Sequence, residues 1–112
     1  MIKYLKLKKL DSEEIKKVIE ITEKEFRIIK RDFKNPLLIV NIHKQRRIGK
    51  DKYSIKLKLE EPRIHQGNMM VAKQFDWDLV KALHKTFDNL KNEIRHKIGK
   101  EEIRKKKKRF WR

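Results

Sequence analysis

The side chains of this sequence best suited to chemistry are cations, many of them at helical spacing beside apolar residues. One group lies in the second half of segment 15–33, and a longer group lies in segment 79–98. Cations on the outer side of a helix attract phosphates without discriminating between nucleic-acid sequences. The alternative for each is a solvated helix face with no ligand. The candidates are Lys24, Arg27, Lys30 and Arg31 in the first group and Lys81, His84, Lys85, Lys91, Arg95 and Lys97 in the second.

A second basic cluster lies in segment 100–112, which has low sequence complexity. It holds eight basic and two acidic residues, so we expect it to be extended or frayed without a partner. Its cations could follow phosphates while Phe110 and Trp111 stack on unpaired bases. The alternative is a solubilising end without fixed contacts. The remaining phosphate-binding candidates in this segment are Lys100, Arg104, Lys105, Lys106, Lys107, Lys108 and Arg109.

The overall charge balance explains why these cations matter. The 112 residues include 33 Lys and Arg against 16 Asp and Glu, a formal net charge of +17. Such an imbalance strains a compact fold by self-repulsion, and a polyanionic partner would relieve it. The absence of cysteine fits a reducing compartment. With its longest apolar run only at Leu37–Val40, and no apolar signal core, we expect a cytoplasmic protein that does not enter membranes.

Groups suited to catalysis or metal binding are scarce. The four histidines do not have metal-ligand spacing, and no nucleophile–base pair is evident around the two serines. Three glycines are too few for a glycine-rich phosphate loop of the usual kind. We therefore expect no enzyme activity, no cofactor, no metal and no small-molecule substrate. Of the aromatic residues, Tyr53 and Trp77 are expected to pack in the core or at its edge rather than stack on bases.

The first half of the chain is predicted to alternate between strands and one helix. Segment 2–10 has the composition of a strand, with a bulge near Tyr4. Asp11 and Glu14 have the spacing of a capping box, and Leu10 and Ile15 that of a hydrophobic staple. Apolar residues then follow at helical spacing until Asn35-Pro36 ends the helix. The stripe comprises Ile15, Ile19, Thr22, Phe26, Ile29 and Phe33.

The second half is predicted to contain three strands and a second helix. Strands are expected at 37–43, 53–59 and 69–74, with a charged turn at 45–52. Asp76 is expected to cap the helix, with Phe75 and Val80 as its staple. Gly99 is expected to end it, which gives a domain at 1–99 and a basic tail at 100–112. The apolar stripe of this helix is Val80, Leu83, Phe87, Leu90, Ile94 and Ile98.

The order of these elements predicts an α+β fold, a β-α-β-β-β-α two-layer sandwich. The last three strands should form an antiparallel meander, and the first should pair in parallel with the second through the helical crossover. The result is a four-stranded mixed sheet with both helices on one face, similar to a double-stranded-RNA-binding domain. We expect the free protein to be a monomer.

The second helix and its neighbours resemble the ribosome hibernation promoting factor and ribosome-associated translation inhibitor A family, in its short form. The resemblance is densest from Asp78-Leu79-Val80-Lys81-Ala82-Leu83, through Phe87-Asp88-Asn89-Leu90, to Ile94-Arg95-His96-Lys97, and includes the hairpin around 49–55. It implies binding to small-subunit rRNA near the groove for mRNA and tRNA, with inhibition of translation or stabilisation of idle ribosomes. The chain departs from the family pattern at His84 and Lys91, which are often acidic there, and in its basic tail.

Other classes of basic protein remain open from the sequence. A double-stranded-RNA-binding module shares the embedded α-β-β-β-α order, although Asp76-Trp77-Asp78 stands where such modules carry lysines that point at phosphates. A small basic ribosomal protein or a DNA-compacting protein would share the charge. A peripheral membrane protein would need exposed apolar residues opposite the lysines, and only Phe110-Trp111 is free to supply them.

Overall fold

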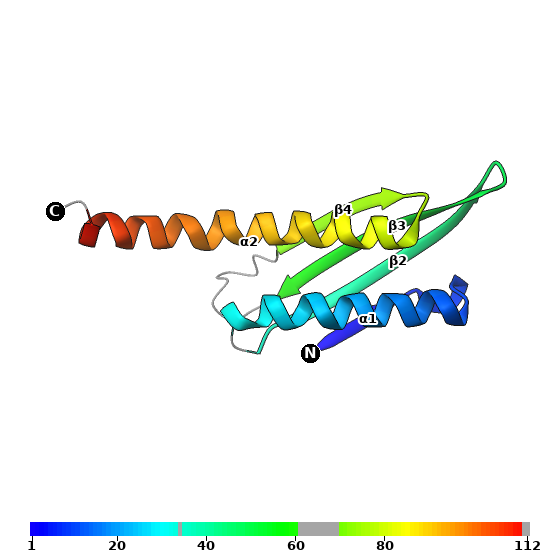
Figure 1. The fold of residues 1–112 in the computed structure, drawn as a ribbon, viewed down its shortest axis with the longest axis horizontal. Helices are drawn as coiled ribbons and strands as arrows, with labels where there is room; N and C mark the ends of the chain where they lie inside the picture. Colours follow the sequence, from blue (N-terminus) through cyan, green and yellow to red (C-terminus); the bar gives the residue numbers. More distant parts are fainter. Residues whose placement is uncertain (34, 61–69, 111–112) are drawn as a thin grey trace.

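The computed structural model describes residues 1–33, 35–60 and 70–110, and the side chains of 1–31, 33, 35–60 and 70–96. Within these ranges the chain runs β-α-β-β-β-α, with a short 3-10 turn at each end of the first helix (Figure 1). The elements are β1 (Ile2–Leu5), a 3-10 turn (Leu7–Lys9), α1 (Ser12–Ile29), a 3-10 turn (Lys30–Asp32), β2 (Leu37–Arg47), β3 (Lys50–Glu60), β4 (Met70–Asp76) and α2 (Leu79–Phe110).

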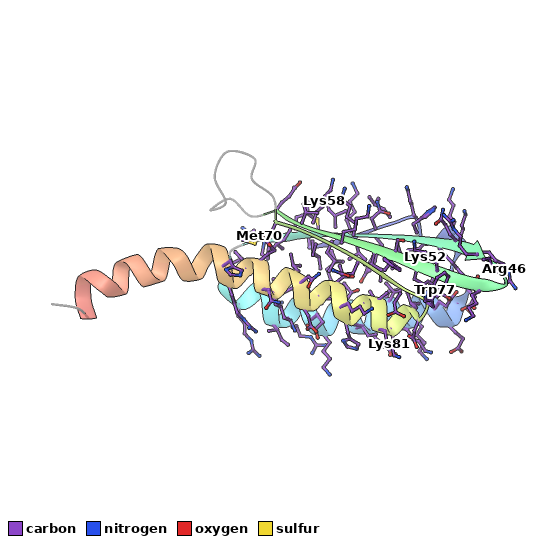
Figure 2. The ribbon with its side chains drawn as sticks, turned by 90° about the horizontal axis from the view of Figure 1, so that it is seen from above. Arg46, Lys52, Lys58, Met70, Trp77 and Lys81 are labelled. Carbon is purple, nitrogen blue, oxygen red and sulfur yellow. The ribbon has the colours of Figure 1, made fainter. Side chains whose placement is uncertain are left out.

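The strands form one mixed sheet in the order β1-β2-β3-β4. β1 pairs with β2 in parallel, as expected for a connection that crosses over through a helix. The β2–β3 and β3–β4 pairs are antiparallel. Both helices lie against the same face of the sheet, and in Figure 2 no helix or strand of the described residues covers the other face. The predicted α+β fold class and topology are therefore confirmed.

The core fills the space between the helices and the covered face of the sheet. Away from the hairpin tip, alternate residues of β2 and β3 are buried, because every second side chain of a strand points to the same face. Each large aliphatic or aromatic residue buried in this layer contributes roughly 1.5–3 kcal/mol through its removal from water. The fully buried side chains include Val18, Thr22, Leu38, Val40, Ile42, Ile55, Leu57, Leu59, Leu83, Phe87 and Leu90.

The N-terminus of α1 is held by the predicted capping box. The Glu14 amide donates to Asp11 Oδ1 at 2.8 Å, and the Asp11 amide donates to Glu14 Oε1 at 3.0 Å. Two otherwise unpaired amides are thereby satisfied. Leu10, just before the cap, is buried, and Ile15 packs against the core.

Two boundaries in the first half differ from the prediction. β1 ends at Leu5 rather than at residue 10, because Lys6 has a φ of 61° and the chain then forms a 3-10 turn. A left-handed residue cannot continue a strand, so no bulge is needed at Tyr4. Similarly, α1 ends at Ile29, and the last turn before the next strand is 3-10.

The β2–β3 hairpin is longer than predicted, and its turn is correspondingly tighter. The ladder runs from the Leu37–Glu60 pair to the Arg47–Lys50 pair. Only Ile48 and Gly49 remain for the turn, so the basic stretch expected to be a loop is mostly strand. Figure 1 shows the tip of this hairpin projecting beyond the helices.

The start of α2 also differs from the prediction. Asp78, not Asp76, caps the helix, with its Oδ1 accepting from the Lys81 amide at 3.2 Å. β4 extends to Asp76, whose Oδ1 instead accepts from the Asp78 amide at 3.0 Å. Phe75 is 51% exposed and Trp77 50% exposed, so neither the staple nor the core position expected for them is correct. Tyr53 is buried, as predicted.

The helix does not stop where the sequence indicated. The α2 backbone continues through Gly99 to Phe110, so segment 100–110 is helical rather than extended. One glycine costs a helix interior only about 1 kcal/mol relative to alanine, and this cost does not end the helix here. The strand expected at 69–74 spans Met70–Asp76, and residue 69 lies outside the described residues.

Candidate nucleic-acid interface

Eight of the residues predicted to bind RNA are exposed on the two helices and on the turn after α1. Lys24, Arg27, Lys30 and Arg31 are all exposed, in the C-terminal half of α1 and the turn after it. Lys81, His84, Lys85 and Arg95 are exposed along α2. Figure 2 shows the labelled Lys81 on the helical side of the molecule, opposite the open sheet face. We call these eight residues the helical basic surface.

Two predicted cations already have carboxylate partners. Lys91 is half-buried and forms an ion pair with the buried Glu25 of α1. Its charge ties the two helices together, and it pairs with α1 instead of standing alone on the outer side of α2. Lys85 lies 2.6 Å from Asp76 Oδ2 but keeps half of its side chain exposed. Lys85 and the Asp78 amide both bond to Asp76 and hold the pKa of that carboxyl below its usual value.

The C-terminal candidates fall in the part of α2 whose backbone alone is described. Figure 1 shows this end of the helix extending well past the sheet. The candidates in question are Lys97, Lys100, Arg104, Lys105, Lys106, Lys107, Lys108, Arg109 and Phe110, while Trp111 lies outside the described residues.

The sequence reasoning missed the open face of the sheet. Strand alternation and register place on it every second residue of β2 and β3 and the odd-numbered residues of β4. Among the described strand residues, Glu60 is the single carboxylate on this face. The signal that could have revealed it was the alternation of cations with leucines along β3. The cations on the open sheet face are Lys3, Arg47, Lys50, Lys52, Lys56, Lys58 and Lys73.

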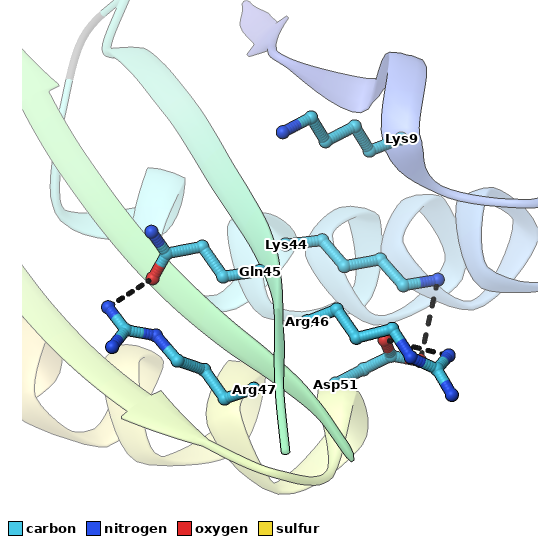
Figure 3. Close-up of a pocket in the computed structure, with 6 residues that line it drawn as sticks. All are labelled: Lys9, Lys44, Gln45, Arg46, Arg47 and Asp51. Carbon is cyan, nitrogen blue, oxygen red and sulfur yellow. Dashed lines mark hydrogen bonds and ion pairs between the residues drawn. The ribbon is translucent and has the colours of Figure 1, made fainter. Parts of the chain in front are cut away.

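A further group of polar residues surrounds a shallow pocket at the hairpin (Figure 3). Lys44 and Arg46 point to one side of the strand, where each reaches Asp51 at about the limit of an ion pair, 4.0 and 3.9 Å. Gln45 and Arg47 point to the other side and bond to each other at 3.5 Å. The side chains that line the pocket thus lie on both sides of the strand and do not point toward one common ligand position.

Lys44 also belongs to a polar contact that fastens α1 to the sheet. Its Nζ lies 2.8 Å from Glu14 Oε1, and the Tyr53 hydroxyl donates to the other carboxylate oxygen. Burial alone would raise the pKa of Glu14, but the bonds from Lys44 and Tyr53 outweigh it and the net pKa is lowered. Burial and the neighbouring carboxylate raise the pKa of Tyr53 strongly. These perturbed groups serve structure, because every one of them is already paired.

The described residues offer no sign of two other kinds of site. They contain no group of three or more histidine, cysteine or acidic side chains able to hold a metal ion. None of the helices in the described part of the chain is long and apolar enough to cross a membrane.

Comparison with known proteins adds a likeness to a solved structure. No family model matches the sequence. No curated protein matches it either. The crystal structure of the Thermus thermophilus Protein Y N-terminal domain superposes with a TM-score of 0.52 at 14% sequence identity, covering 85% of this chain and 92% of that one. The chain thus has the fold of the Protein Y N-terminal domain.

Proposed function

We propose that this protein is a non-catalytic, ribosome-associated factor that binds small-subunit rRNA near the groove for mRNA and tRNA. By occupying that groove it would inhibit translation or stabilise idle ribosomes. The helical basic surface would supply the contacts to the rRNA backbone. No cofactor or small molecule is required for this role, and the free protein would act as a monomer in the cytoplasm.

The observation that carries this proposal is the fold. It is shared with the Protein Y N-terminal domain over most of both chains, and the sequence of α2 independently resembles the ribosome hibernation family. The net charge of +17 supports a polyanionic partner. The exposed cations of α1 and α2 support a contact made through phosphates, which fixes position without reading base sequence.

Sedimentation with purified ribosomal subunits over a series of salt concentrations tests the proposal. We expect the protein to travel with small subunits and to be released as salt rises, because each phosphate contact frees counterions on binding. Large subunits should retain it less at the same salt. Equal retention on both subunits and on unrelated duplex RNA would contradict the proposal and favour a generic double-stranded-RNA-binding module.

A matched pair of variants localises the contact. Lys81→Glu with Arg95→Glu reverses two charges of the helical basic surface, whereas Lys16→Glu with Lys17→Glu makes the same change on exposed residues of α1 outside it. The first pair should weaken subunit binding much more than the second. Equal loss from both pairs would mean that net charge alone governs binding. A protein that leaves ribosomes only when they are unfolded would instead be an intrinsic ribosomal protein.

A further inference from the structure

The open face of the sheet has an arrangement of charge that folding alone does not explain. Lys56 on β3 pairs directly opposite Lys73 on β4, and Lys58 is two residues from Lys56 on the same side. Like charges directly opposite each other destabilise a sheet. Among the described residues, no carboxylate forms an ion pair with Lys56, Lys58 or Lys73. By contrast, Lys44 on the covered face bonds to Glu14.

Exposed aromatic and apolar side chains lie beside these cations. Phe75, near the end of edge strand β4, is 51% exposed, and Trp77, in the turn after the strand, is 50% exposed. Val71 on the same strand is 42% exposed. The Nζ of Lys52 lies 4.3 Å from the centre of the Phe75 ring, so a cation already approaches this aromatic surface. Phe75 itself is opposite Ser54, a small residue that leaves the ring accessible from the sheet face.

The combination of lysines with an exposed ring on the open sheet face fits one occupant best. Lysines attract the phosphates of a nucleic acid, and a four-stranded sheet with exposed aromatic residues can stack unpaired bases. Bases in a duplex are already stacked on each other and cannot use the ring in this way. A second copy of this chain would bring the same positive charge to the face and be repelled.

We propose that the open sheet face is a second RNA-binding surface, separate from the helical basic surface, and that it takes single-stranded RNA. Lys56, Lys58 and Lys73 hold phosphates, and Phe75 stacks on a base. The two surfaces lie on opposite sides of the molecule, so they can be occupied together. This inference does not depend on ribosome association, because the recognition it describes needs only an unpaired RNA segment.

Binding of fluorescent oligo(U) and of a duplex RNA of equal length to the full chain tests the charge component. Lys56→Gln with Lys73→Gln should weaken oligo(U) binding at least tenfold and reduce the salt slope by about 1.4, since a single strand contributes roughly 0.7 per phosphate contact. Lys16→Gln with Lys17→Gln is the control of equal charge. The thermal midpoint of the sheet variant should not fall, because a like-charge pair is removed. An unchanged affinity and slope would overturn the proposal.

Replacement of Phe75 tests the stacking component separately. Phe75→Leu should weaken oligo(U) binding roughly 5- to 150-fold, the range expected for one stacked base, with the salt slope unchanged. Phe75→Tyr keeps the ring and should retain the affinity. Equal loss in both variants, or equal loss for duplex RNA, would show that no base stacks on this ring. Polyglutamate or anionic vesicles that compete as well as oligo(U) would overturn the choice of RNA.

The same variants separate this inference from the proposed ribosomal role. Sheet-face variants that lose oligo(U) binding but still sediment with small subunits would support the second surface alone. Helical-surface variants that lose subunit binding while keeping oligo(U) would support the helical contact alone. If Lys81→Glu with Arg95→Glu abolishes oligo(U) binding and the sheet variants leave it intact, single strands bind the helices and the sheet face is only solvated.

Discussion

Glu14 of α1 and Tyr53 of β3 are joined by a hydrogen bond between the Tyr53 hydroxyl and Glu14 Oε2. The same carboxylate accepts from Lys44 and from the Asp11 amide. It therefore completes the helix cap and attaches the helix to two strands at once. This side chain therefore links the first turn of α1 to β2 and β3.

Replacing Glu14 with Gln should lower the free energy of unfolding by about 1–3 kcal/mol, because bonds to a charged group are lost and Lys44 keeps only the more distant carboxylate of Asp51. The folded pKa of Glu14 lies below its ordinary value of 4.5. Its contribution is therefore present above that value and is lost as pH falls through the lower, folded pKa. The free energies of unfolding of the unmodified protein and of Glu14→Gln, measured with urea between pH 7 and 3, should therefore become equal as the pH falls. A difference between them that stays constant over this range would contradict this role of the Glu14 carboxylate.

The turn of the β2–β3 hairpin should accept a stabilising substitution. Ile48 has a φ of 49° and Gly49 a φ of 75°, and positive φ at both central residues is what a type I′ turn requires. A β-branched residue is strained there, and Ile48 is fully exposed. Ile48→Asn should raise the free energy of unfolding by about 1 kcal/mol, measured by urea unfolding. Gly49→Ala, with no neighbour within 4 Å of the added carbon, should lower it through backbone strain alone.

The ion pair between Lys91 and Glu25 should affect stability without affecting RNA binding. Lys91→Met leaves a buried carboxylate without its cation and should destabilise the protein by roughly 3 kcal/mol. Its effect on the salt slope of RNA binding should be close to zero, because this charge is already neutralised. Arg95→Gln is the matched comparison on the same helix. It should reduce the salt slope of RNA binding and leave the free energy of unfolding nearly unchanged. A salt slope that falls as much for Lys91→Met as for Arg95→Gln would show that Lys91 leaves Glu25 for phosphate.

Structure that depends on neighbouring residues could be predicted from the sequence, whereas the choice between two equally suitable residues could not. Asp11 and Glu14 form the predicted cap because both partners lie within one helical turn. Asp76 and Asp78 are both suitable cap residues, two positions apart. Asp78 caps α2 because Asp76 pairs with Tyr53 across β3 and β4 and so belongs to the strand. No local pattern encodes that ladder.

The candidate site divides in the same way. The exposure of Arg27 and Lys81 follows from helical spacing, so their positions could be predicted. The capture of Lys91 by Glu25 depends on how two distant helices face each other, which spacing within one helix does not contain. The alternation of cations and leucines along β3 predicts a strand with one charged face. That this face is exposed depends on both helices packing on the opposite side of the sheet.

The C-terminal end of α2 provides the last prediction. Gly99 lies inside the helix, so Gly99→Ala should add helix, with a local gain of about 1 kcal/mol visible as increased helical circular dichroism.

Deleting residues 100–112 should leave the thermal midpoint nearly unchanged, because Figure 1 shows this end of α2 extending away from the sheet. The deletion removes eight cations, so it should flatten the salt dependence of RNA binding. Full-length and truncated protein that bind with equal affinity at every salt concentration would show that this segment makes no contact with RNA. Replacing only Phe110 and Trp111 with Ala should lower affinity without changing the slope, because stacking releases no counterions.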